Sequence, residues 1–312
     1  MAFTRAARVA RSKHSFRLAH LYVPCGANRA INLHMPAEIK LPLLLRLLRG
    51  VEFRGKFRLM DAIFGPQLAR HGVTWVQTRV GIPWKLDLTN TTHRWIVYGY
   101  YEGYAFWRWL LQNRQRIEVV FDSGANIGQT SLYFSTLLPS VRVFAYEPGL
   151  AAKTWLQGCV ADNRLNNVHV SAAGLGAKNG EAFLQTCGDE KTHGSWNRID
   201  DTEGERIQVR TIDAEMERLG LTRIDLWKLD MEGGEPAAIA GAASALREGR
   251  IGAIHAEIMG DSGLEVDKLL RSFGFRPYVA RNERLVPAPP TPTRSGDNTL
   301  FIHPKARTSP PA

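Results

Sequence analysis

The chain contains little cysteine and no long hydrophobic run. Three of its 312 residues are cysteine, and Cys25, Cys159 and Cys187 stand far apart, without the Cys-x-x-Cys or Cys/His spacing of a metal site. No metal is therefore expected, and reduced thiols fit a cytoplasmic protein. No stretch approaches the roughly 20 apolar residues of a membrane-spanning helix. With 44% hydrophobic and 22% charged residues, the composition is that of an ordinary globular protein.

Acidic residues are scarce in the first third of the chain. Residues 1–116 hold 19 Lys and Arg against 5 Asp and Glu, whereas residues 117–312 hold 21 against 25. Residues 1–30 are expected to form a disordered tail, although their basic composition also fits an organellar transit peptide. Residues 36–70 combine apolar groups at near-helical spacing with basic residues, which predicts two short helices. Such helices either pack on the main domain, as is more frequent, or contact an anionic membrane.

From residue 117 onward, strand-like and helix-like segments alternate. Strands are expected at 117–122, 141–147, 168–173, 181–187, 206–212, 224–230 and 251–258, with a closing pair at 275–281 and 298–304. Helices are expected at 127–138, 150–163, 235–248 and 264–273, and before residue 117 a hairpin at 72–89 and a helix at 102–112. This alternation predicts an α/β fold with a parallel sheet and helices on both faces. Ligands bind such sheets at the carboxyl ends of the strands.

Glycines and polar residues follow the first of these strands. Asp122 precedes the turn Gly124-Ala125-Asn126-Ile127-Gly128. Glycine allows a sharp turn close to a ligand, and asparagine tolerates positive φ better than most residues. The spacing is not the Gly-x-Gly-x-x-Gly of dinucleotide sites, and the carboxylate of Asp122 would repel a pyrophosphate. The turn is therefore expected to bind a cofactor with a positive centre and no phosphates.

Carboxylates follow two more of the expected strands. Glu147 stands where a carboxylate can accept hydrogen bonds from a ribose diol, a feature shared by dinucleotide and S-adenosylmethionine sites. Asp230, Glu232 and Glu235 stand within six residues of one another, a crowding of charge that water, cations or substrate must relieve. Glu235 is also placed to cap the next helix. Asp230 and Glu232 are the candidate proton acceptors.

Four segments together resemble the FkbM-type methyltransferases: FDSGANIG at 121–128, YEP at 146–148, TID at 211–213 and DLWKLDMEGGEPAAIAGA at 225–242. The resemblance covers about residues 85–303. It implies the class I methyltransferase (Rossmann-like) fold, with a seven-stranded, mostly parallel sheet and helices on both faces. Ser123 departs from the hydrophobic residue usual at its position. The basic segment 1–84 is not explained by the resemblance.

The resemblance also implies an activity and a set of site residues. The enzyme would be an S-adenosylmethionine-dependent methyltransferase, and similar enzymes mostly methylate hydroxyl oxygens on sugars, glycans or secondary metabolites. Asp230 or Glu232 would accept the proton of the acceptor hydroxyl, with His193 and His255 as weaker candidates. The residues expected to bind the cofactor are Asp122, Gly124, Ala125, Asn126, Gly128 and Glu147. Acceptor selectivity is expected in the aromatic segment 93–113 and in residues 187–206.

Three other functions stay open at this point. A nicotinamide-dependent oxidoreductase would carry Gly-x-Gly-x-x-Gly, and a non-catalytic scaffold would not need the acids at the strand ends. A nucleic-acid methyltransferase would place a flipped base with an Asn/Asp-Pro-Pro-Tyr/Phe motif, so no nucleic-acid partner is expected. The expected organisation is a basic extension over 1–84, a methyltransferase domain over 85–304 and a disordered tail over 305–312. The expected location is cytoplasmic, with anionic-membrane contact through the basic third as a variant.

Overall fold

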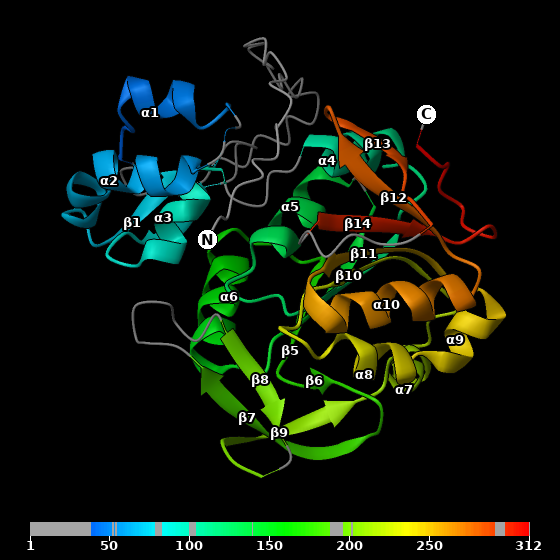
Figure 1. Cartoon of the computed structure of the whole chain (residues 1–312). Helices are drawn as coiled ribbons and strands as arrows, with labels where there is room; N and C mark the ends of the chain where they lie inside the picture. Colours follow the sequence, from blue (N-terminus) through cyan, green and yellow to red (C-terminus); the bar gives the residue numbers. More distant parts are fainter. Residues whose placement is uncertain are drawn as a thin grey trace, which may run out of the picture.

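The computed structural model describes residues 39–51, 53, 55–78, 83–99, 104–138, 140–187, 196–200, 202–290 and 297–311. A twisted sheet lies at the centre of the molecule, with helices on either side (Figure 1). Its strands are β3 (Val119–Ser123), β4 (Arg142–Tyr146), β5 (Val168–Ser171), β10 (Ile224–Leu229), β11 (Ile251–Ile258), β12 (Arg276–Arg281), β13 (Arg284–Pro287) and β14 (Asp297–Ile302).

The strand order confirms the expected fold class. The sheet runs β13-β12-β14-β11-β10-β3-β4-β5, and its five strands from β11 to β5 are parallel. β14 runs antiparallel to β11 and to β12, so the expected closing pair is confirmed. Seven strands were expected in this sheet, and the described residues form eight. The additional strand, β13, follows β12 through Asn282 and Glu283, which both have positive φ, as a two-residue type I′ hairpin requires.

Alternate residues of the central strands enter two different hydrophobic cores. Val120, Val143 and Leu226 pack in one core with α4 (Tyr104–Gln112), α5 (Gln129–Leu137) and α6 (Leu150–Asp162). Phe121, Phe144 and Trp227 pack in the other with α7 (Ile212–Arg218), α8 (Glu235–Ala240), α9 (Ala243–Glu248) and α10 (Gly260–Ser272). Because both faces are covered, hydrophobic residues on these strands face both sides of the sheet rather than one side only.

The helix expected over 235–248 is interrupted. α8 ends at Ala240, and a Cβ on the next residue, Gly241, would lie 2.1 Å from the carbonyl oxygen of Gly176. The carboxylate of Asp213 accepts hydrogen bonds from the amides of Ser244 and Ala245, both at 2.9 Å, and so caps the start of α9. A close backbone approach and a side-chain cap therefore divide the segment into two helices.

A second, smaller sheet lies beside the main one, below it in Figure 1. It consists of β6 (Gly174–Leu175), β7 (Gly180–Cys187), β8 (Trp196–Asp200) and β9 (Glu205–Arg210), in the order β6-β9-β7-β8. The strands expected at 181–187 and 206–212 are present but belong to this sheet, and β8 was not expected. Ala182, Leu184, Ile207 and Val209 form its own small core.

The N-terminal part contains the two helices and the hairpin expected there. These are α1 (Leu43–Leu48), α2 (Lys56–Ala69), β1 (Val73–Gln77) and β2 (Pro83–Asp87), followed by α3 (Thr91–Val97), which was not expected. Met60 and Phe64 of α2 share a core with Leu132 of α5 and Leu156 of α6. The helices therefore pack on the main domain, and the expected boundary at residue 84 falls inside β2.

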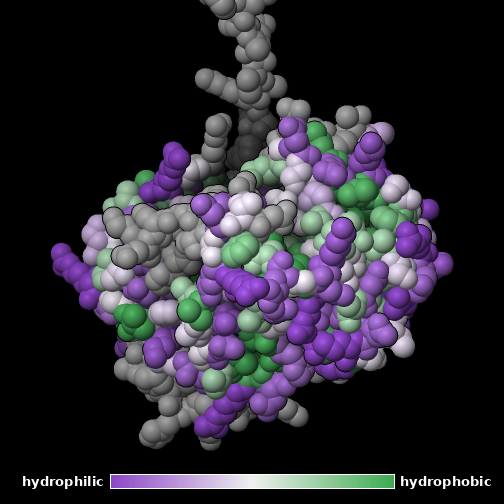
Figure 2. Space-filling model, turned by 90° about the horizontal axis from the view of Figure 1, so that it is seen from below, coloured by the Kyte–Doolittle hydropathy of each residue, from purple (hydrophilic) through white to green (hydrophobic). Residues whose placement is uncertain are grey.

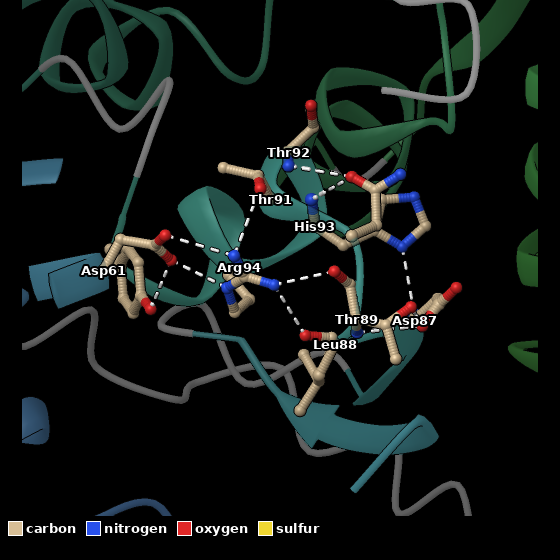
Figure 3. A network of polar contacts seen from close by, with 10 residues as sticks. Asp61, Asp87, Leu88, Thr89, Thr91, Thr92, His93 and Arg94 are labelled. Atoms are coloured by element: carbon tan, nitrogen blue, oxygen red, sulfur yellow. Dashed lines mark hydrogen bonds and ion pairs between the residues drawn. The ribbon is translucent and has the colours of Figure 1, made fainter. Parts of the chain in front are cut away.

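Arg94 joins α2, α3 and the segment after β2 (Figure 3). Its Nε donates to Oδ1 of Asp61 at 2.7 Å, and its Nη1 donates to the carbonyl oxygens of Leu88 and Thr89 at 2.9 and 2.8 Å. The hydroxyl of Tyr98 also donates to Asp61, at 3.0 Å. These charge-assisted bonds fix the position of α3.

The expected disordered tail is wrong for the residues that the structure describes between 305 and 311. The amide of Ser309 donates to Oδ1 of Asn113 at 2.7 Å, and Nε1 of Trp109 donates to the carbonyl of Ser309 at 2.9 Å. Polar side chains of α4 and the residue that follows it thus bind this segment.

The outer surface is mixed in character. On the face shown in Figure 2, hydrophobic residues form small groups among hydrophilic ones. No helix in the described part of the chain is long and apolar enough to cross a bilayer.

Candidate functional site

A pocket of about 340 Å³ opens at the carboxyl ends of β3, β4, β10 and β11. From β3 the chain continues to β4 and β5 on one side, whereas β10 and β11 lie on the other side. The pocket therefore occupies the point at which the strand order reverses, the usual ligand site of an open α/β sheet. Of the residues predicted to form the site, Gly124, Ala125, Asn126, Glu147, Asp230 and Glu232 line it.

The turn after β3 is held closely against two neighbouring strands. The amides of Gly124 and Ala125 both donate to the carbonyl of Tyr146, at 3.1 and 3.0 Å. Gly124 has φ +72°, and a Cβ there would lie 1.8 Å from the carbonyl oxygen of Asp230. Asn126 has φ 49°, the positive value that its residue type was expected to tolerate. Backbone rather than side chain thus forms this wall of the pocket.

The side chains of Ser123 and Asp122, which precede this turn, form buried hydrogen bonds to β10 and α5. The hydroxyl of Ser123 accepts a hydrogen bond from Nε1 of Trp227 at 2.7 Å, which explains a polar residue at a buried position. Oδ2 of Asp122 accepts from the hydroxyls of Thr130 and Ser131 in α5, at 2.8 and 2.6 Å. Asp122 is fully buried and is not among the residues that line the pocket.

Gly128 likewise lies outside the pocket lining. It has φ +98° and precedes α5 as its N-cap residue. Asp122 and Gly128 therefore shape the turn and the start of α5, whereas the neighbouring predicted residues face the pocket.

Glu147 connects the turns after β3 and β4. Its Oε2 accepts from the amide of Asn126 at 2.9 Å and its Oε1 accepts from the amide of Gly149 at 2.8 Å. Burial raises the pKa of Glu147, and the two backbone hydrogen bonds oppose that shift. Each carboxylate oxygen has a second lone pair, so Glu147 can still accept hydrogen bonds from a ligand in the pocket.

Lys228 is a pocket residue to which the sequence assigned no role. Its Nζ lies 3.2 Å from Oδ2 of Asp230 and 3.4 Å from Oδ1 of Asp122. Burial lowers the pKa of Lys228, but the two carboxylates outweigh burial and raise it above its usual value. The ammonium thus partly balances the acidic charge at the end of β10. In the sequence, the feature that could have indicated this role was a lysine inside a hydrophobic strand and close to carboxylates.

Two glutamates add further acidic charge to the pocket. Glu232 has φ +53°, an uncommon backbone conformation for a residue other than glycine. Burial and the neighbouring carboxylates of Asp230, Glu257 and Glu235 raise the pKa of Glu232 to about 7. Burial and the carboxylates of Asp230 and Glu235 also raise the pKa of Glu257. Glu257 stands near the end of β11 but was not among the predicted site residues.

Glu235 does not cap the following helix as the sequence suggested, because α8 begins at Glu235 itself, its N-cap residue is Gly234 and no side chain caps its first amides. Its Oε1 accepts from the amide of Met231 at 2.6 Å and its Oε2 accepts from the amide of Gly233 at 3.0 Å. Glu235 is not among the lining residues. It orders the turn that carries Glu232.

Elements outside the main sheet complete the pocket wall. Trp95 and Ile96 of α3, with Leu184 and Ile199 of the small sheet, supply an apolar surface. Trp95, Ile96 and Ile199 belong to the two segments in which acceptor selectivity was expected. Their contribution depends on the folding of α3 and β8, neither of which was predicted.

Two histidines, His193 and His255, were considered as weaker candidates for the base. His255 is stacked on Phe106, with ring centroids 3.8 Å apart. Burial and the nearby ammonium of Lys228 lower the pKa of His255 to about 3, so it is a neutral, partly buried residue. His193 lies outside the described residues.

The pocket fits the cofactor that the resemblance implies. Its volume lies within the ~300–1,000 Å³ usual for small-molecule sites. Glu147 offers acceptor oxygens for ribose hydroxyls, and the carboxylates of Asp230, Glu232 and Glu257 suit a ligand with a positive centre.

Solved structures with a related arrangement share little sequence with this chain. A precorrin-6y C5,15-methyltransferase from Geobacter metallireducens is 15% identical, with a TM-score of 0.38, over 62% of this chain and 86% of that one. Fibrillarin from Aeropyrum pernix, with natively bound S-adenosylmethionine, is 14% identical, with a TM-score of 0.38, over 74% and 93%. An S-adenosylmethionine-dependent O-methyltransferase from Thermotoga maritima is 13% identical, with a TM-score of 0.36, over 65% and 66%. Comparison with curated proteins gives no match.

One family model matches the part of the chain that contains the pocket. The model of the "Methyltransferase FkbM domain" matches residues 122–277, which is half of the chain and spans β3 to β12. The matched region contains the turn after β3, Glu147 and the acidic residues at the end of β10. The chain therefore belongs to the FkbM methyltransferase family, which confirms the expected methyltransferase class and S-adenosylmethionine as its cofactor.

Proposed function

We propose that the chain methylates a hydroxyl oxygen of a small acceptor, such as a sugar, a glycan end or a secondary metabolite. One observation carries this proposal: a carboxyl group with a pKa of about 7, that of Glu232, lines the same pocket as Glu147 and the turn after β3. S-adenosylmethionine, when bound, supplies an electrophilic methyl group on a positively charged sulfur. Glu147 would hold its ribose hydroxyls, and Gly124, Ala125 and Asn126 would form the wall beside it.

Glu232 is the proposed proton acceptor. As the acceptor oxygen bonds to the transferred carbon, its hydroxyl proton must move to a base. A carboxylate with a pKa near 7 is a stronger base than an ordinary glutamate and is still ionised in a useful fraction at neutral pH. Asp230 is paired with Lys228 at 3.2 Å and is better suited to orient the acceptor than to take its proton.

The charge of the pocket supports an acceptor without phosphate groups. Asp230, Glu232 and Glu257 would repel a nucleic-acid backbone, whereas neutral hydroxyls can donate hydrogen bonds to them. Trp95 offers an aromatic surface on which a sugar ring or another apolar group can pack. We therefore propose a small, neutral or cationic acceptor rather than a nucleic acid.

The test separates cofactor binding from methyl transfer. Calorimetric titration with S-adenosylmethionine, beside NADH, should give binding of the first alone. Incubation with S-adenosylmethionine and a panel of sugars, glycans, phenolic alcohols and RNA should form S-adenosylhomocysteine only with a hydroxylated small acceptor.

Two variants sharpen the result. Glu232→Gln should strongly lower the turnover rate and keep cofactor binding, while the same substitution at Glu265, an exposed residue of α10, should change neither. Cofactor binding without turnover on any acceptor would favour a binding scaffold. Turnover on RNA would overturn the proposed acceptor class.

A further inference from the structure

Exposed hydrophobic side chains are concentrated on the first two helices. Nine large hydrophobic residues are exposed in the described part of the chain, and six of them lie between residues 43 and 63. We define the α1–α2 face by these six residues: Leu43, Leu44, Leu47, Phe53, Leu59 and Ile63. Scattered exposed leucines are normal in soluble proteins, but a local group of this kind marks an interaction surface.

The same helices also have an inner face, so the exposed side chains do not result from a lack of packing. Leu45 of α1 and Met60 of α2 are completely buried in the main core. Nζ of Lys56, the first residue of α2, donates to the carbonyl of Arg49 at the end of α1 at 2.9 Å. The two helices are therefore anchored, and each presents a second apolar surface to solvent.

Positive charge accompanies the exposed apolar groups. Arg46 stands three residues after Leu43 and so shares a helix face with it, and Arg58 is adjacent to Leu59. Lys40, Arg46 and Arg58 are all exposed. Between residues 39 and 70 the sequence has seven Lys and Arg against two acids, Glu52 and Asp61, and Asp61 is ion-paired with Arg94 at 2.7 Å. Residues 1–38 add six Lys and Arg against one acid, Glu38.

We propose that the α1–α2 face docks the protein on the surface of an anionic lipid bilayer. Leucine and isoleucine side chains enter the boundary between headgroups and acyl chains, and adjacent arginines bind the anionic headgroups. A nucleic acid would satisfy the arginines but would leave six exposed hydrophobic side chains without a partner. A dimer of two copies through this face would place the basic residues of both copies, Arg46 and Arg58 among them, in one interface, where like charges repel.

The test uses the full-length chain and vesicles of two compositions. In flotation experiments, the protein should bind vesicles that contain phosphatidylglycerol and should not bind vesicles of phosphatidylcholine alone. The paired substitutions Leu43→Glu and Leu47→Glu should weaken binding about tenfold or more, because they replace inserting groups by charges that the membrane repels. Arg46→Gln with Arg58→Gln should weaken it as well.

Matched controls are available elsewhere on the surface. Leu150 on α6 is 58% exposed, close to the 53% of Leu47, and Leu150→Glu should leave vesicle binding unchanged. Arg276→Gln on β12 is the charge control. The α1–α2 variants should also bind S-adenosylmethionine as the wild type does, which shows that they are folded.

Three results would overturn the proposal. The wild type could fail to float with either vesicle. The leucine variants could bind as tightly as the wild type, which would assign binding to the basic residues alone. The wild type could instead form a dimer that the leucine variants abolish, which would assign the face to a second copy of the chain.

Discussion

Nζ of Lys228 lies 3.2 Å from Oδ2 of Asp230, and this ion pair links β10 to the acidic end of the pocket. The same ammonium lies 3.4 Å from the fully buried carboxylate of Asp122. Lys228→Met would leave both carboxylates without their cation, which typically costs about 3–5 kcal/mol when a buried pair is broken from one side. We expect a loss of that order in the free energy of unfolding, measured with urea.

A double-mutant cycle isolates the pair from general effects of the substitution. Asp230→Asn in the Lys228→Met background should cost less than it does in the wild type, because the unpaired charge is then absent. Lys268→Met, at an exposed position of α10, is the matched control and should be nearly neutral. Strict additivity of Lys228→Met and Asp230→Asn would show that the ion pair does not contribute as described.

Glu147→Gln should weaken S-adenosylmethionine binding with little effect on the fold. The substitution replaces one carboxylate oxygen by an NH₂ group, so either Asn126 or Gly149 loses an acceptor and one ribose hydroxyl does too. Hydrogen bonds to charged groups contribute about 1.5–3 kcal/mol, so the dissociation constant should rise about 10- to 100-fold. Calorimetric titration measures this, and Glu217→Gln, exposed on α7, serves as control. An unchanged affinity would remove Glu147 from the cofactor site.

The sequence was sufficient to predict those parts of the site that depend on single strand ends. The turn around Gly124 and the carboxylate of Glu147 each follow a hydrophobic strand directly, so their position at the carboxyl edge follows from the alternation of strands and helices. Asp122 shows the limit of that reasoning. Its position at the end of β3 was correct, but its side chain points to Thr130 and Ser131 of the following helix.

Residues brought in by other elements were not predictable in the same way. Trp95 lines the pocket because Arg94 fixes α3 through Asp61, 33 residues earlier in the chain. Glu257 lines it because β11 lies beside β10, a neighbour relationship that strand-like composition alone does not specify. The order of strands in space, and the packing of an N-terminal helix over their ends, arise from tertiary contacts rather than from local pattern.

The turnover rate should depend on the protonation of Glu232. Its pKa is raised to about 7, so it is protonated below that pH and cannot accept a proton there. The rate should therefore rise as the pH increases through about 7 and then level off. Glu232→Gln should lower the rate by about 10²–10⁴-fold and remove this rise.

Glu257 provides an independent check on this assignment. Its negative charge contributes to the raised pKa of Glu232, so Glu257→Gln should shift the rise in rate to lower pH without removing it. A pH–rate profile at saturating S-adenosylmethionine measures both effects. A profile that Glu232→Gln leaves unchanged would assign the base to another group.

Acid stability should depend on Glu215, which lies far from the proposed chemistry. Its carboxylate is fully buried and accepts hydrogen bonds from Arg210, Arg218 and the hydroxyl of Tyr146, at 2.7–2.8 Å. Burial raises the pKa of Glu215, but these hydrogen bonds outweigh burial and lower it to about 2. Because the folded pKa lies below the unfolded value of about 4.5, Glu215 stabilises the fold fully above pH 4.5 and loses this effect as the pH falls toward 2.

The free energy that Glu215 contributes to folding follows from the lowering of its pKa, and it is reduced because its partners Arg210 and Arg218 are partly exposed to solvent. A shift of this size corresponds to about 3 kcal/mol at most at neutral pH. Glu215→Gln should therefore lower the free energy of unfolding at neutral pH by about 1–3 kcal/mol. The difference from the wild type should shrink as the pH is lowered below about 4.5, because the unfolded chain then binds a proton at Glu215 while the folded carboxylate stays ionised down to about pH 2. Urea unfolding at a series of pH values measures this difference, with Glu217→Gln of the same helix as the control. A difference that stays constant down to the lowest pH at which the wild type remains folded would mean that the arginine and tyrosine hydrogen bonds do not depend on the charge of Glu215.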